Sequence, residues 1–156
     1  MNQTSEMRGR FLELAGQVIE RLEGVLGELP NLQTDLDTVE TAAVELRSGG
    51  MSARLMHCVA EDFSRLLVLE CVLGTVIAKD RGAFLRGLLA FNLESWPRVL
   101  GLDPGSGAVT CTWTFQLSQT SVQSVAAHCE EAAGLAAEWQ DGGFLAPILT
   151  AMSFLN

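Results

Sequence analysis

The stretch VLGLDPGSGAVTCTWTF, residues 99–115, holds two apolar segments separated by a loop rich in glycine. A phosphate-binding loop of this length would need a lysine beside serine or threonine after its last glycine, and a helix that starts there. Here Gly107 is followed by residues 108–110, which alternate as a strand does. Asp103 and Pro104 favour a turn, and the glycines supply positive φ. The stretch therefore predicts a β-hairpin and no phosphate site.

The N-terminal segment predicts an amphipathic helix that ends at Gly27 and Pro30, because its apolar residues recur at spacings of three and four. These residues form two apolar columns: Phe11, Val18 and Leu22 in one, and Leu12, Ile19 and Leu26 in the other. Such a helix is stabilised mainly by packing, so one column should face the rest of the protein and the other should lie at a rim. The pattern leaves open which column takes which place.

Three strands are predicted next, over residues 38–47, 52–61 and 65–76, after a polar connector at 31–37. The first two alternate apolar and polar residues. The third is apolar on nearly both faces, so it is either central and covered, or one of its faces meets another subunit.

A second helix is predicted to start at Asp80 and to end before Pro97, and a last long helix covers residues 118–139. Short turns between successive strands require antiparallel pairing. The order helix, three strands, helix, two strands, helix predicts an α+β fold, with three helices packed on an antiparallel twisted sheet of about five strands. Residues 1–141 should form this domain, and residues 142–156 an apolar C-terminal tail.

Composition narrows the function classes. The 156 residues carry a formal net charge of −9, which disfavours nucleic acid and anionic membranes as partners. The opening residues lack the apolar region of a signal peptide, and no uncharged window is long enough to span a membrane, so we expect a cytosolic protein with reduced cysteines.

Residues that carry catalysis or bind metal do not form a recognisable set. His57–Cys58 and His128–Cys129 can each offer one ligand easily, and Cys-x-x-Cys and Gly-x-Ser-x-Gly are both absent. We expect no metal, no cofactor and no enzymatic activity. A disulfide between Cys58 and Cys71 is geometrically possible across a hairpin, but the expected cytosolic context argues against it.

Apolar surface is the remaining signal, and it exceeds what one small core needs. We predict a homodimer interface that includes Val72, Phe84, Leu88 and Phe91. We also predict a groove for an extended peptide beside the first helix, formed by Phe11, Val18, Leu22, Ala42, Val44 and Leu46.

Residues 84–117, FLRGLLAFNLESWPRVLGLDPGSGAVTCTWTFQL, resemble the class I chaperones of bacterial type III secretion, the family of the Tir chaperone. In that family a helix with an LL…N pattern leads into a turn with an LDP…SG pattern, then a strand and a last helix that ends near tryptophan. The positions that match are Leu88, Leu89, Asn92, Gly101, Leu102, Asp103, Gly107, Val109 and Trp139. The resemblance covers about residues 80–140, and before them it concerns only the order of elements.

This resemblance implies a homodimer in the bacterial cytoplasm, without catalysis, that holds the N-terminal region of secreted effector proteins in an extended form. It also implies that the secretion ATPase recognises the complex. The long apolar tail and the acidity are closer to chaperones of broad specificity. The alternative is a regulatory module on the same fold, which sequesters another bacterial protein.

Overall fold

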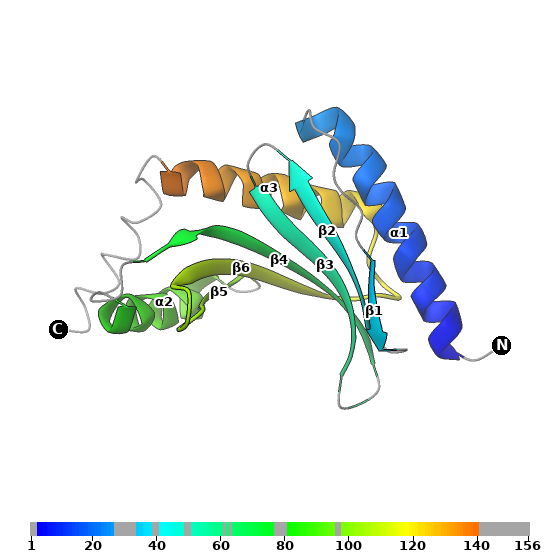
Figure 1. Cartoon of the computed structure of the whole chain (residues 1–156), viewed down its shortest axis with the longest axis horizontal. Helices are drawn as coiled ribbons and strands as arrows, with labels where there is room; N and C mark the ends of the chain where they lie inside the picture. Colours follow the sequence, from blue (N-terminus) through cyan, green and yellow to red (C-terminus); the bar gives the residue numbers. More distant parts are fainter. Residues whose placement is uncertain are drawn as a thin grey trace.

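In the computed structural model, the described residues are 3–26, 34–38, 41–48, 51–60, 62, 64–76, 81–95 and 98–140 (Figure 1). The elements are α1 (Gln3–Leu26), β1 (Thr34–Thr38), β2 (Thr41–Ser48), β3 (Met51–Val59), β4 (Arg65–Thr75), α2 (Arg81–Ser95), β5 (Val99–Leu102), β6 (Ala108–Gln116) and α3 (Val122–Gln140). The predicted order of helices and strands is confirmed, with one strand added. The Asp80 start and the tail at 142–156 fall outside the described residues.

The strands form one antiparallel sheet in the order β1-β2-β3-β4-β6-β5, which confirms the predicted α+β class. It has six strands where the sequence predicted about five. The addition is β1, which lies in the connector TDLDT. This short edge strand is almost entirely polar, so it carries no alternating apolar signal from which it could be predicted.

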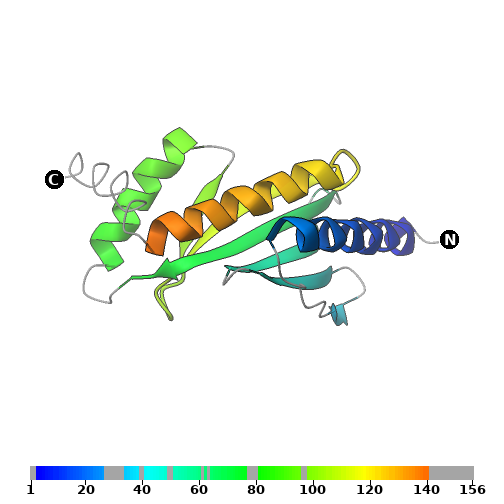
Figure 2. The same cartoon turned by 90° about the horizontal axis from the view of Figure 1, so that it is seen from above.

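One face of the sheet forms the core. The register places Val44 opposite Leu55, Leu55 opposite Leu69, and Leu69 opposite Trp113, and all four side chains are buried. Helices α1 and α3 lie side by side over this face, with α1 above β2 and β3 and α3 above β4 (Figures 1 and 2). The period-two alternation of the sequence is therefore the alternation between core and open face.

The opposite face has no helix over it in the described part of the chain (Figure 2). Arg54 lies directly opposite Glu45 on β2 and Glu70 on β4, so charges of opposite sign alternate across three strands. Val72 also belongs to this face and is 40% exposed. The doubly apolar strand β4 is thus central in the sheet, as one of its two interpretations required, but in the described part of the chain helices cover only one of its faces.

Helix α2 lies at the β5 edge of the sheet, far from α1 (Figure 1). Its Phe84 ring meets the indole of Trp139 edge to face, with 5.9 Å between centroids. The same indole covers Gly74 so closely that a Cβ at this position would overlap it. The end of α3 is therefore fixed between β4 and α2.

The loop between β5 and β6 is the predicted hairpin turn. The Asp103 carboxylate accepts hydrogen bonds from the Ser106 hydroxyl and from the Ser106 and Gly105 amides, the two amides at 3.0 and 3.3 Å. These bonds, the hydroxyl's most of all, hold the pKa of Asp103 below its usual range. The Gly107 amide donates to the Asp103 carbonyl at 2.8 Å, and Gly107 has a φ of 76°. Because these amides are satisfied within the loop, they are not directed at a phosphate.

Candidate protein-binding surfaces

Helix α1 turns its Phe11–Val18–Leu22 column toward the sheet. These side chains, and Val44 and Leu46 beneath them, are at most 1% exposed. A ligand could contact them only if α1 moved away from the sheet, so none of these five residues, which were predicted to bind a peptide, has an accessible side chain. They lie together, but as part of the hydrophobic core. The sixth predicted residue is Ala42, whose side chain is outside the described set.

The other column of α1 is the accessible one. Leu12 is 37% exposed, and Ile19 is partly buried against the core. The question that the sequence left open is thereby answered: the rim column is the one with Leu12 and Ile19. The side chain of Leu26 is outside the described set.

His57 lies under α1 and is 1% exposed. Its ring stacks on Phe11 with 5.6 Å between centroids, and among the described residues neither ring nitrogen has a hydrogen-bond partner. Burial lowers the pKa of His57, and the charges of Arg65 and Arg8 lower it further. The neutral imidazole is therefore favoured beneath α1.

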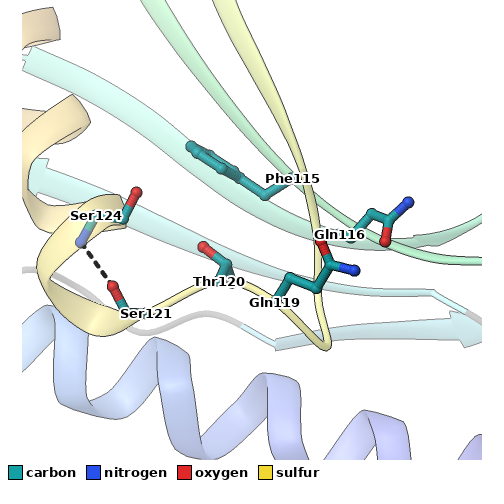
Figure 3. A pocket seen from close by; sticks show the side chains of 6 residues that line it. All are labelled: Phe115, Gln116, Gln119, Thr120, Ser121 and Ser124. Carbon is teal, nitrogen blue, oxygen red and sulfur yellow. Dashed lines mark hydrogen bonds between the residues drawn. The ribbon is translucent and has the colours of Figure 1, made fainter.

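A polar furrow runs between α1 and the start of α3. One hollow of about 260 Å³ is lined by residues of the β6–α3 connection (Figure 3): Phe115, Gln116, Gln119, Thr120, Ser121 and Ser124. A second hollow, of about 450 Å³, shares Thr120 and Ser121 and adds Arg10, Glu13 and Gln17 from α1. We call these two hollows the α1–α3 furrow.

Local hydrogen bonds fix the walls of the α1–α3 furrow. Arg10 donates from Nη2 to the Ser118 carbonyl at 3.1 Å, which ties α1 to the β6–α3 connection. Ser121 caps α3 by accepting a hydrogen bond from the Ser124 amide at 3.2 Å (Figure 3). Hydroxyl and amide side chains that remain along the furrow can donate to and accept from a peptide backbone. The sequence predicted that the last helix already covers residues 118–121, whereas α3 begins at Val122 and Ser121 precedes it as a cap.

The β5 edge of the sheet is closed by one side chain. Asn92 on α2 donates to the Leu100 carbonyl at 2.7 Å and accepts from the Leu100 amide at 2.8 Å. Its amide thus occupies both backbone groups of Leu100, which a further strand would otherwise use at this position. The backbone of β1, which pairs only with β2, forms the opposite edge.

The predicted dimer residues separate into two environments. Phe84 and Leu88 are 4% and 1% exposed and belong to the core, and Phe91 packs partly against it. Val72 alone of the four is exposed, on the open face of the sheet. Phe84 and Leu88 are needed inside one chain, because α2 must pack on β5 and Trp139.

The outer side of α2 exposes a different set of leucines. Leu85, Leu89 and Leu93 are 43%, 60% and 86% exposed. They follow one another at intervals of four, so they form a single column along the helix. We call it the α2 column.

The cysteines behave as packing residues. Burial raises the pKa of Cys71, and it raises the pKa of both Cys111 and Cys129 to about 12. Cys71 pairs in register with Ala53 and Cys58 with Leu66, on opposite faces of the sheet, so the disulfide that the sequence left open is excluded. In the part of the chain that is described, no group of three metal-binding side chains occurs.

Two of three comparisons with known proteins found matches. The family model of the Tir chaperone protein (CesT) family matches residues 29–140. Among solved structures, the ExsC–ExsE complex aligns at a TM-score of 0.58 and 20% identity, over 90% of this chain and 96% of that one. The HopA1–SchA chaperone–effector complex aligns at a TM-score of 0.47 and 18% identity, over 84% of this chain and 93% of that one. No curated protein sequence matched.

No helix among the described residues is long and apolar enough to cross a membrane.

Proposed function

Because the chain belongs to the Tir chaperone protein (CesT) family, we propose that it is a bacterial cytosolic chaperone for type III secretion effectors. It binds the N-terminal region of an effector and keeps that region extended and competent for secretion. The family match over residues 29–140 carries this proposal. In the proposed pathway the secretion ATPase then recognises the complex, and the chain itself carries out no chemical step.

The accessible surfaces beside α1 suit an extended peptide. The rim column, with Leu12 and Ile19, can cover apolar side chains of the effector. The α1–α3 furrow next to it offers the side-chain amide of Gln119 and the hydroxyl of Ser121 to the peptide backbone. A net charge of −9 favours effector segments that carry basic residues. Strand addition is directed away from β5, since Asn92 occupies that edge.

We also propose a homodimer, with the open sheet face around Val72 as part of the interface. Light scattering measures this directly, and a monomer mass at micromolar concentration would exclude it. Val72→Asp should lower the mass to that of one chain while the folded state persists, because this side chain is exposed in a single chain. Leu88→Asp should unfold the protein instead, because it places an unpaired charge in the core.

The binding proposal is tested by capture from the native bacterium, followed by co-expression with the N-terminal region of the captured protein. Leu12→Asp should reduce co-purification at least tenfold and leave the melting temperature within about 2 °C, because this side chain is exposed. Ile19→Asp should reduce co-purification as well, but it should also lower the melting temperature, because Ile19 packs partly against the core. Glu20→Ala, an exposed polar position on α1 that belongs neither to the rim column nor to the furrow lining, is the matched control.

Two results would contradict the proposal. One is unchanged capture by both rim variants and by Gln119→Ala in the furrow. The other is a captured partner that binds through a folded domain and has no secreted N-terminal region, which would instead support a regulatory module.

A further inference from the structure

Positive charge gathers around a buried imidazole near the start of α1. Arg8 on α1 and Arg65, the first residue of β4, are the charged groups of the described chain that act on the ring of His57 on β3. The register neighbours of His57 are Ala42 and Leu67, which do not titrate. Two guanidinium groups repel each other. A chain with 10 basic residues and a net charge of −9 would not bring two of them together without an anion to bind.

Hydrogen-bond donors of this cluster are buried without an acceptor. Among the described residues neither ring nitrogen of His57 has a hydrogen-bond partner, and this side chain is 1% exposed. Arg8 Nε is also buried without a partner, and Arg8 takes part in no ion pair within the same set of residues. The acceptor that satisfies such donors and offsets the repulsion is a carboxylate, whose two oxygens match the fork of a guanidinium.

The cluster lies at one end of the accessible column of α1. Arg8 precedes Leu12 by four residues, so it continues the rim column toward the N-terminus. The side chains of Arg8 and Arg65 are half-buried, so part of each meets solvent, whereas His57 is enclosed. An extended peptide that follows the rim column therefore reaches the two arginines.

We propose that Arg8, Arg65 and His57 form a binding site for one carboxylate, the side chain of an aspartate or glutamate in the extended segment that the chain binds. The arginines contact the carboxylate, and the neutral ring of His57 supplies a further N–H donor. The source of the carboxylate rests on the proposed function, whereas the chemistry of the site does not.

The geometry also fixes where the acidic residue stands in the bound segment. At a helical rise of about 1.5 Å per residue, Arg8 lies about 6 Å along α1 from Leu12 and about 16 Å from Ile19. An extended peptide advances about 3.3 Å per residue. The acidic residue should therefore be about two residues from the one that covers Leu12 and about five from the one that covers Ile19.

The chemistry of the site is tested on the full chain with acetate as the probe. Sodium acetate replaces sodium chloride at constant ionic strength, and nuclear magnetic resonance follows the ring signals of His57, with those of His128 as internal reference. The His57 signals should shift saturably with acetate at pH 7. The pKa of His57 should also rise, because a bound carboxylate offsets the charges of Arg8 and Arg65.

Variants of Arg8 separate binding from folding. Arg8→Gln should abolish the acetate response, and Arg8→Lys, which keeps the charge without the fork, should retain part of it. Arg21→Gln removes the same charge from an exposed position of α1 and is the matched control. Melting temperatures show which variants are folded, and Arg8→Lys carries the test if Arg8→Gln is not.

The source of the carboxylate is tested with the N-terminal segment of a captured effector. Each aspartate or glutamate of the segment is replaced in turn by asparagine or glutamine. One replacement should weaken binding to the native chain about tenfold, and it should weaken binding to Arg8→Gln less than about twofold, because its partner is already lost.

The possible failures are distinguishable. Equal responses of His57 to acetate and chloride, or an acetate response that Arg8→Gln retains, would overturn the site. A captured segment in which no acidic residue couples to Arg8 would overturn the assignment of the carboxylate to the partner. Failure to capture any secreted segment would contradict both the proposed function and that assignment, and the acetate result would still decide the site itself.

Discussion

Asn92 holds β5 to α2, and its replacement measures how much this contact contributes. Asn92→Ala removes two hydrogen bonds of 2.7 and 2.8 Å to the backbone of Leu100, a residue that is 3% exposed. At about 1 kcal/mol for each bond, and more where water cannot replace the lost partner, the free energy of unfolding should fall by about 2–4 kcal/mol. The uncovered strand edge should also raise the tendency to aggregate.

The two bonds can be separated by a second variant. Asn92→Asp keeps an acceptor for the Leu100 amide, but it places a carboxylate oxygen against the Leu100 carbonyl. The loss at pH 7 should equal or exceed that of Asn92→Ala, and part of it should be recovered at acidic pH, where a protonated carboxyl can donate. Urea denaturation followed by circular dichroism gives both values, with Arg86→Ala on exposed α2 surface as control. A loss below about 0.5 kcal/mol for Asn92→Ala would refute the reasoning.

Three further predictions concern the core. Phe11→Ala should cost about 3–5 kcal/mol of stability, whereas Leu12→Ala, one position along α1, should cost less than about 1 kcal/mol; equal losses in urea denaturation would mean that α1 is oriented differently. The pKa of His57 is lowered in the folded state, so the unfolded chain binds a proton more readily. The free energy of unfolding should therefore fall as the pH drops below 6.5, by up to about 1.4 kcal/mol per pH unit. Thermal melts between about pH 7.5 and 5 should show this slope for the native chain and not for His57→Leu. Gly74→Ala should cost about 1–3 kcal/mol, since its Cβ would displace the indole of Trp139; unchanged tryptophan fluorescence and an unchanged melting temperature would contradict this close packing.

The order of helices and strands could be predicted because the spacing of apolar residues and the residues that form turns are local properties of the sequence. Alternation at Val44, Leu46, Ala53 and Leu55 indicated strands with one buried face, and the residues from Asp103 to Gly107 indicated the hairpin by turn chemistry alone. Strand β1 could not be predicted in this way. It is a strand because it pairs with β2, although its composition is polar. A prediction made from a few neighbouring residues does not include the partner strand.

Which apolar residues face the core could not be predicted from one helix at a time. In α1 both columns are apolar, and only the packing of α1 against α3 and β2 determines that Val18 is buried and Leu12 exposed. In α2, Leu88 and Leu89 are adjacent and chemically identical, yet one is core and the other surface. The α1–α3 furrow was not predicted because it is formed by two segments that are about a hundred residues apart.

Because three of its thiols are buried, cysteine labelling can report when the core of this protein opens. Cys71 and Cys111 lie opposite each other on the neighbouring strands β4 and β6, and Cys129 lies on α3, the helix that covers this part of the sheet. An alkylating reagent should reach them only when α3 separates from the sheet, so their labelling rates should coincide and report that event. Cys58, on the open face, should react earlier and independently. A partner that stabilises the whole fold would slow the three together, whereas one that only covers the open face would protect Cys58 alone.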